Sequence, residues 1–168
     1  GHSDICRSYV WEKTERCKAT EKKDKSYTKE KTTEFAKEVE STRGKLKEKL
    51  IELKYDGVHV ASDFELSQDP KKIYAYGAPA KGNTLLNYFE IDHTLIDKAV
   101  EINEMKIGYY LPGSHVPIVK EDPTDIPDYY LLLSHNFADE IISKNQKLID
   151  KGVKFIIPFP EIKIILRY

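Results

Sequence analysis

Hydrophobic residues recur at helical spacing in the first third of the chain. Residues 29–54 place five of them on one stripe of a helix: Phe35, Val39, Leu46, Leu50 and Leu53. The opposite face is rich in lysine and glutamate, and Asp56-Gly57 supplies a stop signal. We therefore predict an N-terminal amphipathic helix over residues 29–54.

After Pro70 the pattern changes to short apolar runs separated by turns. Five runs are predicted to be strands: 73–76, 99–102, 116–119, 129–133 and 153–157. The run 162–166 is a candidate for pairing at a sheet edge. Helices are predicted over residues 83–89 and after Asn136, whose side chain is suited to cap a helix start.

Alternating strands and helices predict an α/β fold with a doubly wound, mostly parallel, five-stranded sheet. Right-handed crossovers favour the strand order 3-2-1-4-5. The switch point of that order lies between the first and fourth strands. The loop at 77–84 and Ser134-His135-Asn136 should therefore line one crevice at the carboxyl edge, where such sheets bind ligands.

The loop at 77–84 has several features of a phosphate-binding loop: small residues between a strand and a helix, and one lysine, Lys81. Gly77 and Gly82 keep the outer spacing of the dinucleotide fingerprint. Pro79 replaces the middle glycine and has no N–H to donate, so an ordinary NAD site is not expected. A single phosphate or another anion remains a candidate ligand, and the alternative is a tight turn that binds nothing.

Three further polar residues are candidates for ligand contacts. Glu101 follows the second strand, where nucleotide-binding sheets place an acidic group for the ribose hydroxyls, and a solvated glutamate is the alternative. His115 in a stiff turn and His135 after the fourth strand either donate hydrogen bonds to a ligand or hold a loop. No nucleophile–base–orienter set can be assembled from the linear sequence, so no catalytic residue is predicted.

Composition narrows the class of partner. The chain has 168 residues, of which 40% are hydrophobic, which suits one domain with an appendage. No apolar run approaches ~18 residues, so no membrane partner is expected. The net charge is −1. The basic excess of residues 12–54 fits a solvated helix face better than a nucleic-acid surface.

The two cysteines, Cys6 and Cys17, match no zinc-ligand spacing, so no metal site is predicted in this chain. Two incidental thiols are typical of a cytoplasmic protein, and we predict that location.

The segment from Gly77 to Tyr88 resembles the signature of the C-terminal domain of sugar C-methyltransferases. These enzymes use S-adenosylmethionine to methylate nucleotide-linked deoxysugars. Three more segments resemble family motifs in the same order: 110–118 is similar to LPGTHIPI, 127–133 to PDYVLIL, and 157–161 to a closing P-x-P-E turn. The likeness covers residues 33–165.

The resemblance implies a Rossmann-like C-terminal domain over residues 29–168. Residues 1–28 would be a boundary segment that faintly resembles the end of an upstream methyltransferase domain. S-adenosylmethionine, a zinc region and the family's catalytic His, Tyr and Glu would all belong upstream. No cofactor is therefore expected in this chain, which alone should not be catalytic although its parent is a methyltransferase.

The implied partners are a nucleotide-linked sugar and the upstream methyltransferase domain. Ten residues form the predicted substrate-binding set: Gly77, Ala78, Lys81, Gly82, Asn83, Thr84, Glu101, His115, His135 and Asn136.

The chain departs from the family pattern at the rim of the crevice. The family's Pro-Trp-Asn after the fourth strand is Ser134-His135-Asn136 here, so that only Asn136 carries over. The segment of residues 58–70, between the first helix and the first strand, is longer than is usual in the family. Two other readings stay open. One is a purely structural or dimerisation module, and the other is a free-standing nucleotide-binding protein.

Overall fold

A computed structural model describes residues 28–56 and 69–166. The predictions for Cys6 and Cys17 and for most of the 58–70 segment lie outside the described residues. The chain divides into two compact units, Gly1–Ser41 and Thr42–Tyr168. In the described part of the chain, no helix is both long and apolar enough to cross a membrane.

The predicted N-terminal helix is confirmed as α2, Lys29–Tyr55. The division between the two units falls within this helix. The predicted apolar stripe is buried only toward its end, at Leu46, Leu50 and Leu53, whereas Phe35 is exposed. The predicted domain start at residue 29 stays a prediction.

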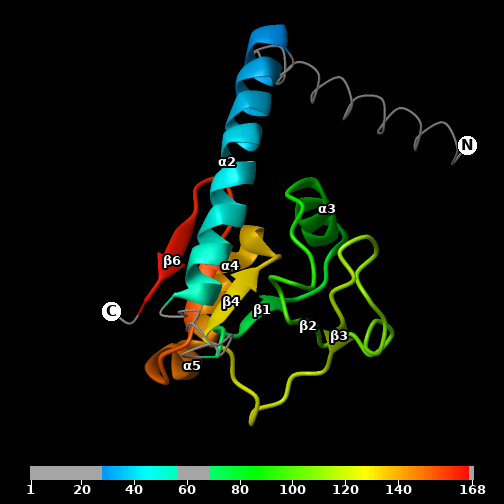
Figure 1. The fold of residues 1–168 in the computed structure, drawn as a ribbon, viewed down its shortest axis with the longest axis vertical. Helices are drawn as coiled ribbons and strands as arrows, with labels where there is room; N and C mark the ends of the chain where they lie inside the picture. The colour runs from blue at the N-terminus through cyan, green and yellow to red at the C-terminus, as the bar shows by residue number, and fades with distance from the viewer. Residues whose placement is uncertain (1–27, 57–68, 167–168) are drawn as a thin grey trace, which may run out of the picture. The chain divides into compact units, whose positions relative to one another are not determined.

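The sheet of the second unit has six strands among the described residues, in the order β3-β2-β1-β4-β5-β6 (Figure 1). Their bounds are β1 Ile73–Tyr76, β2 Lys98–Val100, β3 Ile118–Val119, β4 Tyr129–Leu132, β5 Lys154–Ile157 and β6 Lys163–Ile165. The first five are parallel and follow the predicted order. The run predicted as a possible edge strand is β6, which pairs antiparallel with β5. The predicted α/β fold is confirmed.

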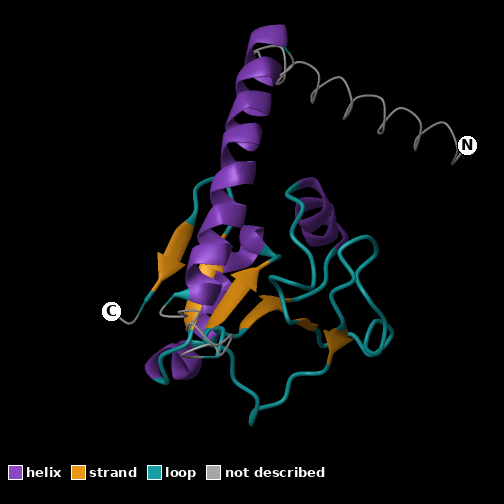
Figure 2. Cartoon of the chain, viewed as in Figure 1, coloured by secondary structure: helices purple, strands orange, loops and turns teal. Residues whose placement is uncertain are grey.

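The helices differ from the prediction at their ends. They are α3 Ala80–Tyr88, a 3-10 turn His135–Phe137, α4 Ala138–Lys144 and α5 Gln146–Asp150 (Figure 2). The prediction began α3 at residue 83, but Pro79 is its N-cap. Pro79 has an extended backbone, and its carbonyl accepts the first hydrogen bond of the helix from the Asn83 N–H at 3.0 Å. The prediction that Asn136 caps a helix was wrong, because Asn136 lies inside the 3-10 turn. The helix beyond is split at Asn145, whose side chain donates to the Ile141 carbonyl.

The two faces of the sheet are covered by different elements. Tyr74, Tyr130 and Leu132 belong to a buried cluster that includes Ala138 of α4 and Ile149 of α5. Side chains alternate along a strand, so neighbouring residues face the opposite side.

On that opposite side α3 packs against the end of β4, since an added Cβ on Gly82 would lie 2.5 Å from Leu133 Cβ. Arg43, in the middle of α2, forms an ion pair with Glu90, two residues after α3.

A buried lysine fixes α2 to the sheet. Lys54 Nζ lies 2.7 Å from Asp97 Oδ1 and 3.2 Å from the Leu95 carbonyl oxygen. The other carboxylate oxygen of Asp97 accepts a hydrogen bond from the Ile73 N–H at 2.8 Å. The helix is thus held to the first residue of β1, so that this central strand is fixed at its amino end.

Candidate functional site

The loops after β1 and β4 face each other at the carboxyl edge of the sheet. Gly77 turns the chain with a φ of 80°, and its N–H donates to the Val100 carbonyl at 2.8 Å. An added Cβ on Gly77 would lie 3.4 Å from Ser134 Oγ. This juxtaposition confirms the switch-point geometry that the strand order predicts.

Gly82 permits close packing between helix and strand. The 2.5 Å separation between its virtual Cβ and Leu133 Cβ is too short for any side chain. Gly77 and Gly82 therefore keep the turning and packing roles that the outer glycines have in a dinucleotide fingerprint. Pro79, extended at φ −75° and ψ 154°, stands between them and offers no N–H.

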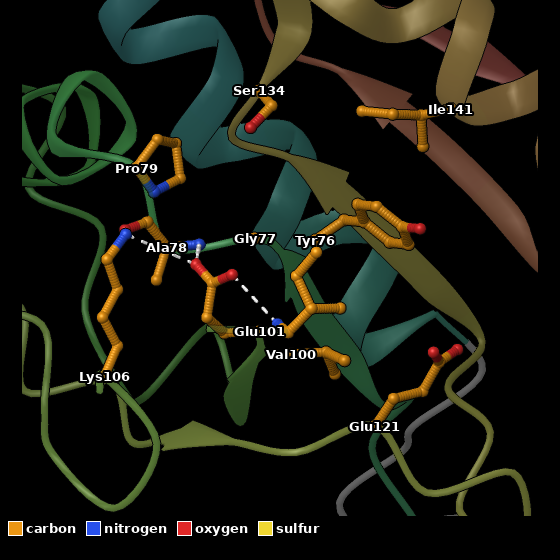
Figure 3. Close-up of a pocket in the computed structure, with 11 residues that line it drawn as sticks. Tyr76, Gly77, Ala78, Pro79, Val100, Glu101, Lys106, Glu121, Ser134 and Ile141 are labelled. Carbon is orange, nitrogen blue, oxygen red and sulfur yellow. Dashed lines mark hydrogen bonds and ion pairs between the residues drawn. The ribbon is translucent and has the colours of Figure 1, made fainter. Parts of the chain in front are cut away.

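A pocket of about 220 Å³ opens at this switch point (Figure 3). Its walls come from the ends of β1 and β2, the loops that follow β1, β2, β3 and β4, and α4. The lining residues are Tyr76, Gly77, Ala78, Pro79, Val100, Glu101, Ile102, Lys106, Glu121, Ser134 and Ile141. Two predicted residues from the loop and one from the end of β2 are thus brought together.

The Glu101 carboxylate is held by three backbone N–H donors and one ion pair. One oxygen accepts from the Ala78 N–H at 3.0 Å and lies 3.5 Å from Lys106 Nζ. The other accepts from the N–H groups of Ile102 at 2.9 Å and Asn103 at 3.2 Å. Partial burial opposes ionisation, but the N–H groups of Asn103, Ala78 and Ile102 outweigh it and lower the pKa of Glu101. The group is therefore an anion at neutral pH with its acceptor positions occupied.

A second pocket, of about 420 Å³, is also lined by Ala78 and Pro79. It shares Ala78, Pro79 and Lys106 with the first pocket. The residues that sequence reasoning missed here are large and exposed: Met105, Tyr109 and Tyr110. The adjacent tyrosines in a turn-rich loop were the signal that could have indicated them.

The charge of Lys81 acts on His135, but neither residue lines either pocket, so their roles as substrate contacts stay predictions. Partial burial and the positive charge of Lys81 both lower the pKa of His135. The His135 ring also contacts the Phe159 ring, with centroids 6.0 Å apart. His135 is therefore neutral at pH 7 and held against the loop after β5.

Other predicted residues lie apart from the first pocket. Asn83 lines the second pocket, and the Thr84 hydroxyl donates to the Ala80 carbonyl within α3. His115 packs its ring against His93, near the carboxyl end of α3, and lines neither pocket. Asn136 is exposed. Their roles as substrate contacts stay predictions.

Two of the segments used for the resemblance contact each other. The Asn87 side chain donates to the Pro112 carbonyl at 2.9 Å and to the Asn83 carbonyl at 2.8 Å. An added Cβ on Gly113 would lie 1.9 Å from Asn87 Oδ1. Asn87 and Gly113 therefore hold the loop of residues 110–117 against α3.

Within residues 28–56 and 69–166, no group of three or more His, Cys, Asp or Glu side chains is arranged to hold a metal ion.

Comparison with known proteins identifies the family. The model of the C-methyltransferase C-terminal domain matches residues 64–160, which contain both pockets. The chain belongs to this family. C-methyltransferase NovU of Streptomyces niveus is 39% identical over 99 residues, which are 58% of this chain and 24% of NovU. The match thus spans about a quarter of that relative's length, and the C-terminal assignment makes an upstream domain the expected partner.

Proposed function

We propose that this chain is the accessory C-terminal domain of an S-adenosylmethionine-dependent sugar C-methyltransferase. It contributes to binding a nucleotide-linked sugar and packs on the upstream catalytic domain. The observation that carries the proposal is the pair of adjoining pockets at the switch point of the sheet. The domain that contains them belongs to the C-methyltransferase C-terminal family. Doubly wound sheets bind their ligands at this position.

The size and lining of the pockets support an extended ligand. At about 420 Å³ the larger pocket falls in the range of small-molecule sites, which is roughly 300–1,000 Å³. Tyr109 and Tyr110 offer flat rings for a base, since every base has a face that stacks on an aromatic ring. Lys81 supplies a positive charge at the start of α3, beside the loop after β4.

The proposal assigns the methyl-transfer chemistry to the parent protein. We place S-adenosylmethionine and zinc in its upstream part and the protein in the cytoplasm. The 168-residue chain is therefore expected to transfer no methyl group from S-adenosylmethionine, and turnover by the isolated chain would contradict this.

Thermal unfolding with a panel of nucleotide-sugars tests the binding proposal. A ligand that binds the folded state and not the unfolded state raises the melting temperature, and the rise grows with the ratio of ligand concentration to Kd. Each nucleotide-sugar is compared with the nucleotide diphosphate that lacks the hexose. We expect a shift with at least one nucleotide-sugar that exceeds the shift with its parent diphosphate.

One observation favours a second function, a structural or dimerisation module. Ile102, Met105, Tyr109 and Tyr110 form a run of exposed large hydrophobic residues beside the pockets. Exposed apolar surface of this kind marks interaction sites. A melting temperature unchanged by every nucleotide-sugar at millimolar concentration would favour this module over the binding domain.

A further inference from the structure

Two carboxylates line the smaller pocket, and they differ in their hydrogen bonding. Glu101 directly follows β2, and Glu121 follows β3. In Figure 3, dashed lines reach Glu101 from neighbouring donors and none reaches Glu121. In nucleotide-binding sheets the acidic group after the second strand is the one that binds ribose hydroxyls.

Glu101 and Lys106 hold one peptide group from both sides. Glu101 accepts the Ala78 N–H at 3.0 Å, and Lys106 Nζ donates to the Ala78 carbonyl at 2.9 Å. The two side chains also form an ion pair at 3.5 Å. Because Ala78 lines both pockets, this pair holds a lining peptide group that the two pockets share.

The acceptor capacity of Glu101 is used in this arrangement. An ionised carboxylate has about four acceptor sites. Three backbone N–H groups donate to Glu101, and the Lys106 ammonium forms an ion pair with it at 3.5 Å. A ligand hydroxyl would have to displace a backbone N–H and leave it without a partner, which costs free energy. Glu101 is therefore poorly suited to receive a hydroxyl.

Glu121 is free to do so. Its side chain is exposed and lines the pocket, and within the described part of the chain it makes no hydrogen bond or ion pair. An ionised carboxylate accepts hydrogen bonds from hydroxyl groups. At Glu121 no backbone N–H would have to be displaced first. The larger pocket offers the exposed rings of Tyr109 and Tyr110 for a base, which assigns the hexose to the smaller pocket.

We propose that Glu101 and Lys106 are positioning residues that fix the Ala78 peptide, and that Glu121 is the carboxylate that accepts hydrogen bonds from the hexose hydroxyls. The assignment of Glu121 rests on the proposed function. The role of Glu101 and Lys106 does not, because it concerns the chain without ligand.

Amide hydrogen exchange in the ligand-free 168-residue chain tests the positioning pair. In Glu101→Gln, one carboxylate oxygen becomes an NH₂ donor, which cannot accept from a backbone N–H. We expect the Ala78 amide to exchange at least about tenfold faster than in the wild type, the factor that 1.4 kcal/mol gives. Glu121→Gln is the matched control and should leave the Ala78 rate unchanged.

Lys106→Met is a second variant, which keeps the Ala78–Glu101 bond and removes the Ala78 carbonyl contact. It should raise the Ala78 exchange rate by less than Glu101→Gln does. An Ala78 rate that neither variant changes would overturn the positioning role.

Calorimetric titration tests Glu121. The probes are UDP-glucose and thymidine-diphosphate-glucose, each compared with its parent diphosphate. Glu121→Gln should weaken binding of the glucose derivatives about tenfold and leave the diphosphates unchanged, since a hydrogen bond to a charged group is lost. Unchanged affinity for the glucose derivatives would overturn the assignment.

The two parts fail separately. A wild-type chain that binds neither glucose derivative would contradict the proposed function and the Glu121 assignment together. The Ala78 exchange rates would still decide the role of Glu101 and Lys106.

Discussion

The two edges of the sheet use their charged residues differently. At the amino edge, Asp125 accepts from Lys98, from Lys72 at 2.9 Å and from the Tyr74 hydroxyl at 2.8 Å. These three partners hold the pKa of Asp125 well below its usual range, with Lys98 the largest cause. At the carboxyl edge, Glu121 and the tyrosine pair of the larger pocket remain exposed. The amino edge is thus closed by satisfied charges, whereas the carboxyl edge keeps groups available to a ligand.

Packing at the carboxyl edge is expected to show the largest mutational effect. Gly82→Ala adds a Cβ about where Leu133 already lies, so that helix or strand must shift. Overpacking of this kind destabilises by about 1–3 kcal/mol, and we expect a value near the upper end in urea unfolding.

Gly44→Ala is the control for Gly82→Ala. Gly44 lies within α2 with nothing within 4 Å of its virtual Cβ. Because alanine favours a helix by about 1 kcal/mol over glycine, this change should stabilise the chain. Destabilisation of equal size by both changes would contradict the packing role of Gly82.

Loss of an exposed ring is expected to affect binding and not stability. Tyr109→Ser removes one of the two rings of the larger pocket. Stacking between a base and an aromatic ring is worth about 1–3 kcal/mol, so affinity for a nucleotide-sugar should fall by about tenfold or more in calorimetry. The free energy of unfolding should change by less than about 0.5 kcal/mol, because the side chain is exposed.

The amino edge should respond in stability and in its pH dependence. Asp125→Asn is expected to cost about 1 kcal/mol at pH 7, a modest value because the side chains are partly solvated. The folded pKa of Asp125 lies below its unfolded value, so its contribution is complete above about pH 4 and is lost as the pH falls through the folded pKa.

Acid unfolding followed by circular dichroism measures this effect. The Asp125→Asn variant should lose less stability than the wild type when the pH is lowered below about 4. Glu104→Gln, at an exposed position in the same unit, is the control and should keep the wild-type profile. Identical acid profiles for Asp125→Asn and the wild type would refute the contribution of the amino edge.

The smallest expected effect concerns His135. Burial and Lys81 lower its folded pKa, so the unfolded chain binds more protons and stability falls as the pH drops from 7 through the unfolded value near 6.5. His135→Gln should reduce this fall by a fraction of 1 kcal/mol. An NMR titration of the His135 ring in the Lys81→Met variant should show a higher pKa for His135 than in the wild type.

The sheet could be predicted from the sequence because short apolar runs and handed crossovers leave few strand orders. The crevice at the switch point was predictable for the same reason, and the structure places Gly77 against Ser134 there. The partners of Glu101 could not be predicted from the sequence. Its contacts with Ala78 and Lys106 depend on the conformation of the loops that follow β1 and β2. The break at Asn145 escaped prediction because it depends on a local side-chain hydrogen bond.

The central claim is that a nucleotide-sugar binds at the carboxyl edge and not at the amino edge. Amide chemical-shift mapping with thymidine-diphosphate-glucose and UDP-glucose tests it most directly. We expect perturbations at Gly77, Ala78 and Tyr109, on the walls of the two pockets, with Lys98 and Asp125 unaffected. Perturbations confined to the amino edge, or none with either sugar at millimolar concentration, would contradict the claim.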